Sequence, residues 1–332
     1  MDSSQLQQQL FRHIKSILPA NISLADDLAA VLKISTDSAY RRIRGEKPIS
    51  VDELFMLCSH YQISFDQFLN VNSDTIIFQG RNVDTTSFRF DQYLKDMLRN
   101  VIYINSFKRI NFIYLCKDIP VFHHFHFREI AAFKYHFWLK TIFTHPEFVN
   151  RKIDFEKYPE EIFELGNRNL HQYNIMDTVE LWNVETMNST IRQIDYYRDM
   201  NMFQSNADVL IMYETLEKLI GHLEQQAELG FKFRVDDPER KPLGKFQVYI
   251  NEVILGDNSI LVELDDAKLT YLIHNVANFM VTRDREFCDY TYNSLQNLMR
   301  KSTLISSTGE KERSRFFKRL RDKIARRKNS LK

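Results

Sequence analysis

The feature that most constrains this chain is a series of closely spaced helix signals within its first seventy residues. Apolar residues at positions 6, 10, 14, 17 and 18 repeat with helical spacing and predict a first helix that ends at Pro19. Each later helical stretch follows a serine whose side chain can cap a helix: Ser23, Ser35, Ser50 and Ser64. The sequence therefore predicts five short helices in residues 1–70.

The second to fifth of these predicted helices follow a known order. Residues 28–45 (LAAVLKISTDSAYRRIRG) and residues 48–68 resemble the helix-turn-helix of the phage-repressor (Cro/C1-type, XRE-like) family. Ala29 fits the small-residue position where two helices cross, and Gly45 fits the end of the recognition helix. Two residues depart from the family pattern, because Lys33 stands where glycine is usual and Arg42 where an inward apolar residue is common.

The resemblance implies a DNA-reading helix at about residues 36–44. An α-helix fits the major groove of B-DNA, and residues near its N-terminus reach the base edges. The positions implied to read bases or lie close to them are Thr36, Asp37, Ser38, Tyr40 and Arg41. The positions implied to hold phosphates are Arg44 and Lys47, together with Arg42 if that side chain points outward.

The remainder reads as a larger, mostly helical α+β domain with a small sheet, so the fold class expected for the whole chain is mainly α. Periodicity predicts helices at about 90–101, 128–143, 159–174, 185–203, 205–229, 284–300 and 309–328. Strand-like sequence lies at 75–78, 109–116, 121–127, 246–255, 259–263 and 269–274. A Gly-Asp-Asn turn at 256–258 predicts that the fourth and fifth of these strands form a β-hairpin.

Composition shifts divide the chain into four expected parts. Residues 1–70 form the helix-turn-helix domain, 71–88 a linker, 89–309 a regulatory or oligomerisation domain, and 310–332 a basic amphipathic C-terminal helix. This last part holds 11 Lys and Arg but only 3 Asp and Glu, whereas the first holds 7 and 8. The basic helix is expected to dock on the acidic body, with DNA phosphates or an acidic membrane surface as alternatives.

No motif in the chain predicts an enzyme, a cofactor or a metal site. Phosphate-binding glycine loops and nucleophile elbows are missing from a sequence with only 8 glycines. His124 and His126 would share one face of the strand expected at 121–127, but no Cys or carboxylate stands at ligand spacing, so packed histidines are expected. The aromatic stretch 121–143 is either a plain core or the wall of a ligand pocket.

These observations predict a sequence-specific DNA-binding transcription regulator. We expect it to be cytoplasmic, since the chain has no membrane span or secretory signal, and dimeric, since one such module buries little surface on DNA. The body is expected to sense a small molecule or a protein. The alternative is a protein-interaction module, an antirepressor or scaffold, that keeps the helix-turn-helix fold without reading DNA.

Overall fold

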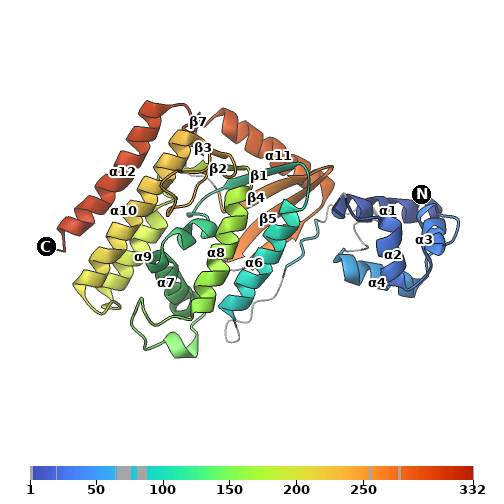
Figure 1. Cartoon of the computed structure of the whole chain (residues 1–332), viewed down its shortest axis with the longest axis horizontal. Helices are drawn as coiled ribbons and strands as arrows, with labels where there is room; N and C mark the ends of the chain where they lie inside the picture. Colours follow the sequence, from blue (N-terminus) through green and yellow to red (C-terminus); the bar gives the residue numbers. More distant parts are fainter. Residues whose placement is uncertain are drawn as a thin grey trace.

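The computed structural model describes residues 3–19, 21–63, 65, 76–80, 88–253, 256–275 and 278–331. The chain is mainly helical, with one mixed β-sheet. Its first four helices form a small unit at one end of the long axis, and all other elements form a larger body (Figure 1). Within the described residues, no helix combines the length and apolar content that a membrane span requires.

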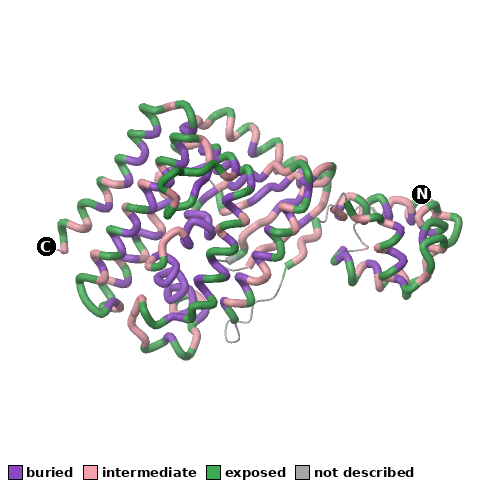
Figure 2. The backbone as a smooth tube through the Cα atoms, viewed as in Figure 1, coloured by how far each residue is buried: buried purple, intermediate pink, exposed green. Residues whose placement is uncertain are grey.

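The N-terminal unit, residues 3–63, contains four helices around a core of its own. They are α1 (Ser3–Ile17), α2 (Leu24–Leu32), α3 (Thr36–Ile43) and α4 (Val51–Tyr61). Its buried apolar residues form a cluster separate from those of the body, as the tube in Figure 2 illustrates. The fifth helix expected here falls on residues of which only Phe65 is described, so that prediction lies outside the described residues.

The helix-start signals of this unit act as expected at three serines. The Oγ atoms of Ser23, Ser35 and Ser50 accept hydrogen bonds from backbone N–H groups three residues later. At Ser50 the box is complete, because Glu53 accepts in return from the Ser50 N–H at 3.1 Å. These caps satisfy N–H groups that the first turn of a helix leaves without partners, which is why helices this short form.

The body is built on one seven-stranded sheet with the strand order β6-β5-β4-β1-β2-β3-β7. The strands β1, β2 and β3 run parallel in its centre, and the other four pair antiparallel. The strands are β1 (Ile110–Leu115), β2 (Thr178–Trp182), β3 (Phe246–Ile250), β4 (Ser259–Leu264), β5 (Ala267–Asn275), β6 (Asn278–Thr282) and β7 (Thr303–Leu304). Chain segments far apart in the sequence thus meet in the central strands.

Helices cover both faces of this sheet. Along β1, Phe112 and Tyr114 face the main core, while Ile113 faces a smaller cluster that includes Leu295 of α11 (Arg285–Arg300). Helices that pack into the main core cover the face of Phe112 and Tyr114. They are α6 (Phe90–Asn105), α7 (Arg128–Phe137), α8 (Glu160–Ile175), α9 (Asn188–Asp199) and α10 (Asn206–Leu229). The alternation of β1 side chains between the two clusters follows from the opposite directions of successive side chains along a strand.

The C-terminal helix α12 (Glu310–Asn329) docks on the body, as expected. Its apolar stripe, including Phe317, Leu320 and Ile324, is buried against the main core. Basic residues beside the stripe pair with acidic groups of neighbouring helices, Arg321 with Glu224 and others. This helix and α3 lie at opposite ends of the long axis of the molecule in Figure 1.

Two strand predictions for the body were wrong. Residues 246–255 and 259–263 do not form a hairpin, because β1 and β2 lie between β3 and β4 in the sheet. Residues 121–127 are not a strand: Val121–His126 form the 3₁₀ helix η1, whose buried backbone is satisfied by local bonds such as His123 N–H to Pro120 C=O at 3.0 Å.

Other differences concern elements that the sequence signals missed or overextended. The strands β2, β6 and β7 were not predicted, and the described residues 76–78 do not form the strand expected at 75–78. The helix expected at 128–143 is α7 continued by a π-helical turn, Trp138–Ile142. The N-cap of α12 is Gly309, in the left-handed region at φ 65°, so the helix begins one residue later than expected.

Candidate nucleic-acid interface

The turn between α2 and α3 sets the direction of α3. Lys33 ends α2 in the left-handed conformation, with φ at 54°, and the Ile34 N–H then bonds to the Ala29 carbonyl at 3.0 Å. This backbone geometry is the one that glycine adopts most readily. The chain therefore makes the tight turn at Lys33 despite carrying a side chain there.

Two residues of α3 face the interior of the unit. Ala39 is fully buried, and Arg42 lies beside Glu53 of α4, with Nε 3.1 Å from Oε2. The Arg42 Nη1 also donates to the Ser38 Oγ at 2.7 Å. Hydrogen bonding from Arg42 lowers the pKa of the Glu53 carboxyl, which stays ionised and keeps the pair charged.

This geometry corrects the expected role of Arg42. A phosphate contact required the side chain to point outward, whereas the structure buries it at the position where an inward apolar residue is common. Its long stem fills the interior, and Glu53 with Ser38 satisfies the guanidinium. Ser38 is half-buried and already accepts from Arg42, so it is less available than the residues that precede it.

The other predicted residues lie together on the outer side of α3 and just beyond its end. They are exposed to solvent: Thr36, Asp37, Tyr40, Arg41, Arg44 and Lys47. The side chains of Arg41 and Arg44 are each 54% exposed. Figure 1 places α3 at the end of the unit remote from the body, so no element that the structure describes in the body covers this face.

Glu46, which sequence reasoning did not single out, lies among the basic residues of this face. Its carboxylate accepts from Arg44 Nε at 2.6 Å and lies 4.0 Å from Arg41 Nε. Hydrogen bonding from Arg44 lowers the pKa of Glu46, so the group is an anion at neutral pH. A carboxylate here competes with any anionic ligand for the two guanidinium groups. The sequence signal that could have identified Glu46 is its position two residues after Arg44.

Gln7 of α1 is a second residue that sequence reasoning missed. Its buried side-chain amide donates to the carbonyls of Arg42 and Lys47, at 2.7 and 2.8 Å, and accepts from the Ile49 N–H at 3.0 Å. These bonds hold the end of α3 and the segment that follows it against α1. Gly45 helps in this approach, because its φ is +78° and an added Cβ would lie 2.4 Å from the Ser4 Oγ.

The remaining chemical candidates have structural roles. In η1 it is His123 and His126 that share a face, with Nδ1 and Nε2 3.5 Å apart, and the His123 Nε2 lies 2.9 Å from Glu180 Oε1. Asp284 caps α11 by accepting from the Phe287 N–H at 2.8 Å. Among the described residues, no group of three or more His, Cys, Asp and Glu is arranged to hold a metal ion.

The N-terminal unit touches the body through a few polar contacts. The Tyr103 hydroxyl of α6 donates to the Ile17 carbonyl at 2.6 Å, and the Gln79 side chain donates to the Gln62 carbonyl. All of these contacts lie on the side of the unit away from α3. In comparisons with known proteins, no protein family, no curated protein and no solved structure matches this chain.

Proposed function

We propose that this chain is a sequence-specific DNA-binding regulator of transcription. In this proposal α2 and α3 are the two helices of a helix-turn-helix, within a five-helix domain of the Cro/C1 type, and α3 enters the major groove. The observation that carries the proposal is the exposed face of α3, where Thr36, Asp37, Tyr40 and Arg41 project from a helix fixed on its other side.

The exposed basic residues have two proposed roles, base reading and phosphate binding. Arg41 makes a bidentate contact with guanine, which discriminates against a wrong base by about 1–3 kcal/mol. Arg44 and Lys47, at the far end of the helix, hold phosphates and set the register without reading sequence. The residues 1–70 carry no net positive charge, so affinity for DNA of arbitrary sequence is expected to be modest.

The proposed active form is a homodimer that binds a two-fold symmetric operator. One module of this size covers too little DNA for tight specific binding, and two α3 helices would read half-sites about one helical turn apart. The proposal contains no catalytic step and no cofactor. A regulator of this kind would act in the cytoplasm of a cell that keeps its DNA in that compartment.

The test is selection of short genomic DNA fragments on the purified full-length chain at two salt concentrations, repeated with Arg41→Ala. We expect a palindromic motif, weaker retention at the higher salt, and relaxed preference at one position in each half-site of the variant. Arg285→Ala, a change at an exposed arginine of α11, serves as the matched control and keeps the motif. The proposal is rejected if the DNA fragments retained at low salt show no enriched motif with either the wild type or Arg41→Ala.

The alternative, a protein-interaction module, is favoured by one specific observation. Val51 and Phe55 of α4 lie one helical turn apart and are 82% and 72% exposed, so they form an apolar pair on the surface of the same unit. Apolar groups exposed in this way suit a protein partner. The second function replaces the first if DNA selection fails, and if the wild-type chain retains a cellular protein that the Phe55→Ser variant does not retain.

A further inference from the structure

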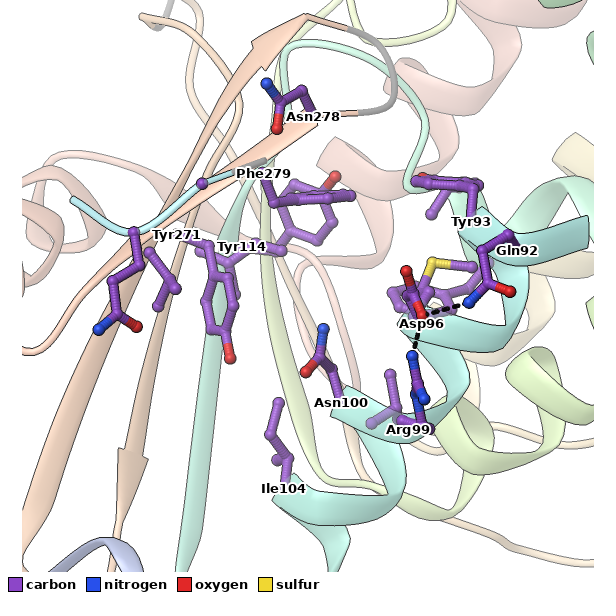
Figure 3. Close-up of a pocket in the computed structure, with 18 of the residues that line it drawn as sticks. Gln92, Tyr93, Asp96, Arg99, Asn100, Ile104, Tyr114, Tyr271, Asn278 and Phe279 are labelled. Atoms are coloured by element: carbon purple, nitrogen blue, oxygen red, sulfur yellow. Dashed lines mark hydrogen bonds and ion pairs between the residues drawn. The ribbon is translucent and has the colours of Figure 1, made fainter. Parts of the chain in front are cut away.

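A large cavity lies in the body next to the N-terminal unit. Its volume is about 910 Å³, and it is bounded by α6 on one side and by strands of the sheet, β1, β5 and β6, on the other (Figure 3). Cavities of this size hold drug-sized ligands in other proteins. Neither the proposed DNA contacts nor the packing of the body requires an open space at this place.

The walls of the cavity are mainly aromatic. Tyr114 of β1, Tyr271 of β5 and Phe279 of β6 line the sheet side. Tyr93 of α6 packs against this wall, with its ring nearly parallel to that of Phe279 and the two centroids 6.3 Å apart. Aromatic rings along the cavity wall favour a ligand with a planar ring system, since ring stacking adds to the burial of apolar surface.

The polar groups of the cavity favour an uncharged ligand that can form hydrogen bonds. The Tyr93 hydroxyl is buried and finds no hydrogen-bond partner among the described residues. From the same helix, Asn100 extends toward the strands (Figure 3). The charged lining residues are each paired with an opposite charge, Arg89 with Asp91 and Arg99 with Asp96. A charged ligand would have to compete with these pairs.

We propose that this cavity binds an uncharged small molecule with a planar, largely apolar ring system and a hydrogen-bonding group that reaches the Tyr93 hydroxyl. The ring system lies between α6 and the sheet, and its polar edge faces the amides at the cavity rim. The one carboxylate among the described lining residues, Asp96, is paired with Arg99, so the occupant is proposed as a ligand of regulatory rather than catalytic use.

The position of the cavity links its occupant to the N-terminal unit. Gln62, which ends α4, and Gln79, in the segment leading into the body, both form part of its wall. The Gln79 backbone pairs with Val281 of β6 through bonds of 2.7 and 2.8 Å. A ligand therefore contacts the sheet, the connecting segment and the end of α4 at once. The regulatory consequence, a change in DNA affinity, rests on the proposed function, whereas binding itself does not.

The test uses Nile red, an uncharged planar dye whose fluorescence rises in apolar surroundings, with the full-length chain and without DNA. We expect saturable binding of one dye per chain. Val101→Trp, which fills the cavity from α6, should weaken binding at least tenfold. The matched control is Ile102→Trp on the same helix, at a position 45% exposed to solvent, and it should bind as wild type does.

A substitute variant and a charged dye complete the test of the site and of the ligand class. Should Val101→Trp fail to fold by circular dichroism, Val101→Phe takes its place. Anilinonaphthalene sulfonate, a charged aromatic dye, should bind more weakly than Nile red, and tighter binding of the charged dye overturns the proposed ligand class. Equal affinity of Nile red for wild type and a folded cavity-filling variant, or no saturable binding, overturns the site.

The link to the N-terminal unit has its own readout. Hydrogen exchange should slow on dye binding in α6, in residues 76–80 and at the end of α4, and stay unchanged in α12. Protection confined to α6 and the sheet overturns the link while leaving the site in place. Because neither measurement uses DNA, failure here is separate from failure of the DNA-binding proposal.

Discussion

The guanidinium of Arg42 and the carboxylate of Glu53 form a two-point ion pair inside the N-terminal unit, with Nη2–Oε1 at 2.5 Å and Nε–Oε2 at 3.1 Å. The same carboxylate accepts from the Ser50 N–H. One acidic group thus completes the cap of α4 and holds α3 by an interior cation. This carboxylate therefore helps to orient the proposed DNA-reading face, together with the turn at Lys33 and the bonds of Gln7.

Loss of Arg42 is therefore expected to destabilise the unit. In Arg42→Ala the Glu53 carboxylate loses its charged partner and a gap opens beneath α3, which should cost about 3 kcal/mol of unfolding free energy. Denaturation monitored by hydrogen exchange in residues 3–63 measures the loss. Arg44→Ala removes an exposed arginine from the same turn and should leave the midpoint unchanged; equal effects of the two changes would contradict the buried-pair interpretation.

Removal of the Glu46 carboxylate is expected to strengthen DNA binding. Glu46→Gln keeps the size of the side chain but frees Arg41 and Arg44 from a competing anion, so affinity for a selected operator should rise by roughly threefold at low salt. Fluorescence anisotropy with labelled operator measures the change. Glu239→Gln, which breaks an exposed pair with Lys241 in the body, is the control. A fall in affinity would show that Glu46 supports the interface.

The unliganded body is expected to gain stability when the Tyr93 hydroxyl is removed. In Tyr93→Phe the ring contacts remain, while a buried polar group without a described partner is lost, so the free energy of unfolding should rise by about 1 kcal/mol. Thermal unfolding in the absence of ligand tests this. Tyr290→Phe, at an exposed site, should change nothing, and a destabilised Tyr93→Phe would mean that the hydroxyl is already satisfied.

Stability is expected to fall as the pH drops from about 6.5 to about 4. Burial lowers the pKa of His136 from its ordinary 6.5 to about 4, and burial likewise lowers that of His222 to about 4. Below pH 6.5 the unfolded chain therefore binds protons that the folded chain refuses, and at pH 5 each histidine costs about 2 kcal/mol. Above pH 6.5 both states are neutral and the effect vanishes.

Urea midpoints of wild type and His136→Asn at pH 7 and pH 5 measure the contribution of one histidine. Asparagine can keep a hydrogen bond to the Tyr158 hydroxyl, which lies 2.8 Å from the His136 Nδ1. The variant should show a smaller loss between the two pH values. His274→Asn, at an exposed position of β5, should lose as much as wild type. An unchanged loss in His136→Asn would show that the histidine is protonated in the fold.

Local signals in the sequence predicted most helices because the residues that cap them act at short range. Ser50 with Glu53, and Ser205 with Asp208, form complete capping boxes, and Gly230 ends α10 in the left-handed region. The residues expected on the outer side of α3 came instead from the resemblance to the phage-repressor helix-turn-helix. The direction of the Arg42 side chain could not be predicted from sequence, because only the tertiary position of Glu53 decides which way it points.

The strands were harder because their partners are distant in sequence. The strand β2 was missed: Glu180 interrupts its apolar pattern, yet the carboxylate is buried and receives hydrogen bonds from Tyr173 and Trp182. The Gly-Asp-Asn turn at 256–258 predicted a hairpin on local grounds, whereas the flanking strands pair with β2 and β1. Of the stretch 121–143, expected to be a plain core or a pocket wall, Val121 and Phe122 line the cavity and most of the rest packs in the main core. The other walls come from α6 and strands far apart in the sequence, which local signals could not bring together.

If the chain binds an operator as proposed, the pairing of Gln79 with Val281 at the sheet edge has a consequence for the layout of that operator. It ties the chain that leaves the N-terminal unit to β6, and the Tyr103 bond to Ile17 adds a second attachment. A unit held in this way cannot swing freely to meet half-sites at different distances. In a dimer, the spacing of half-sites along the DNA would thus be dictated by how two bodies pair, and a change at that pairing surface would alter which promoters are recognised without touching α3.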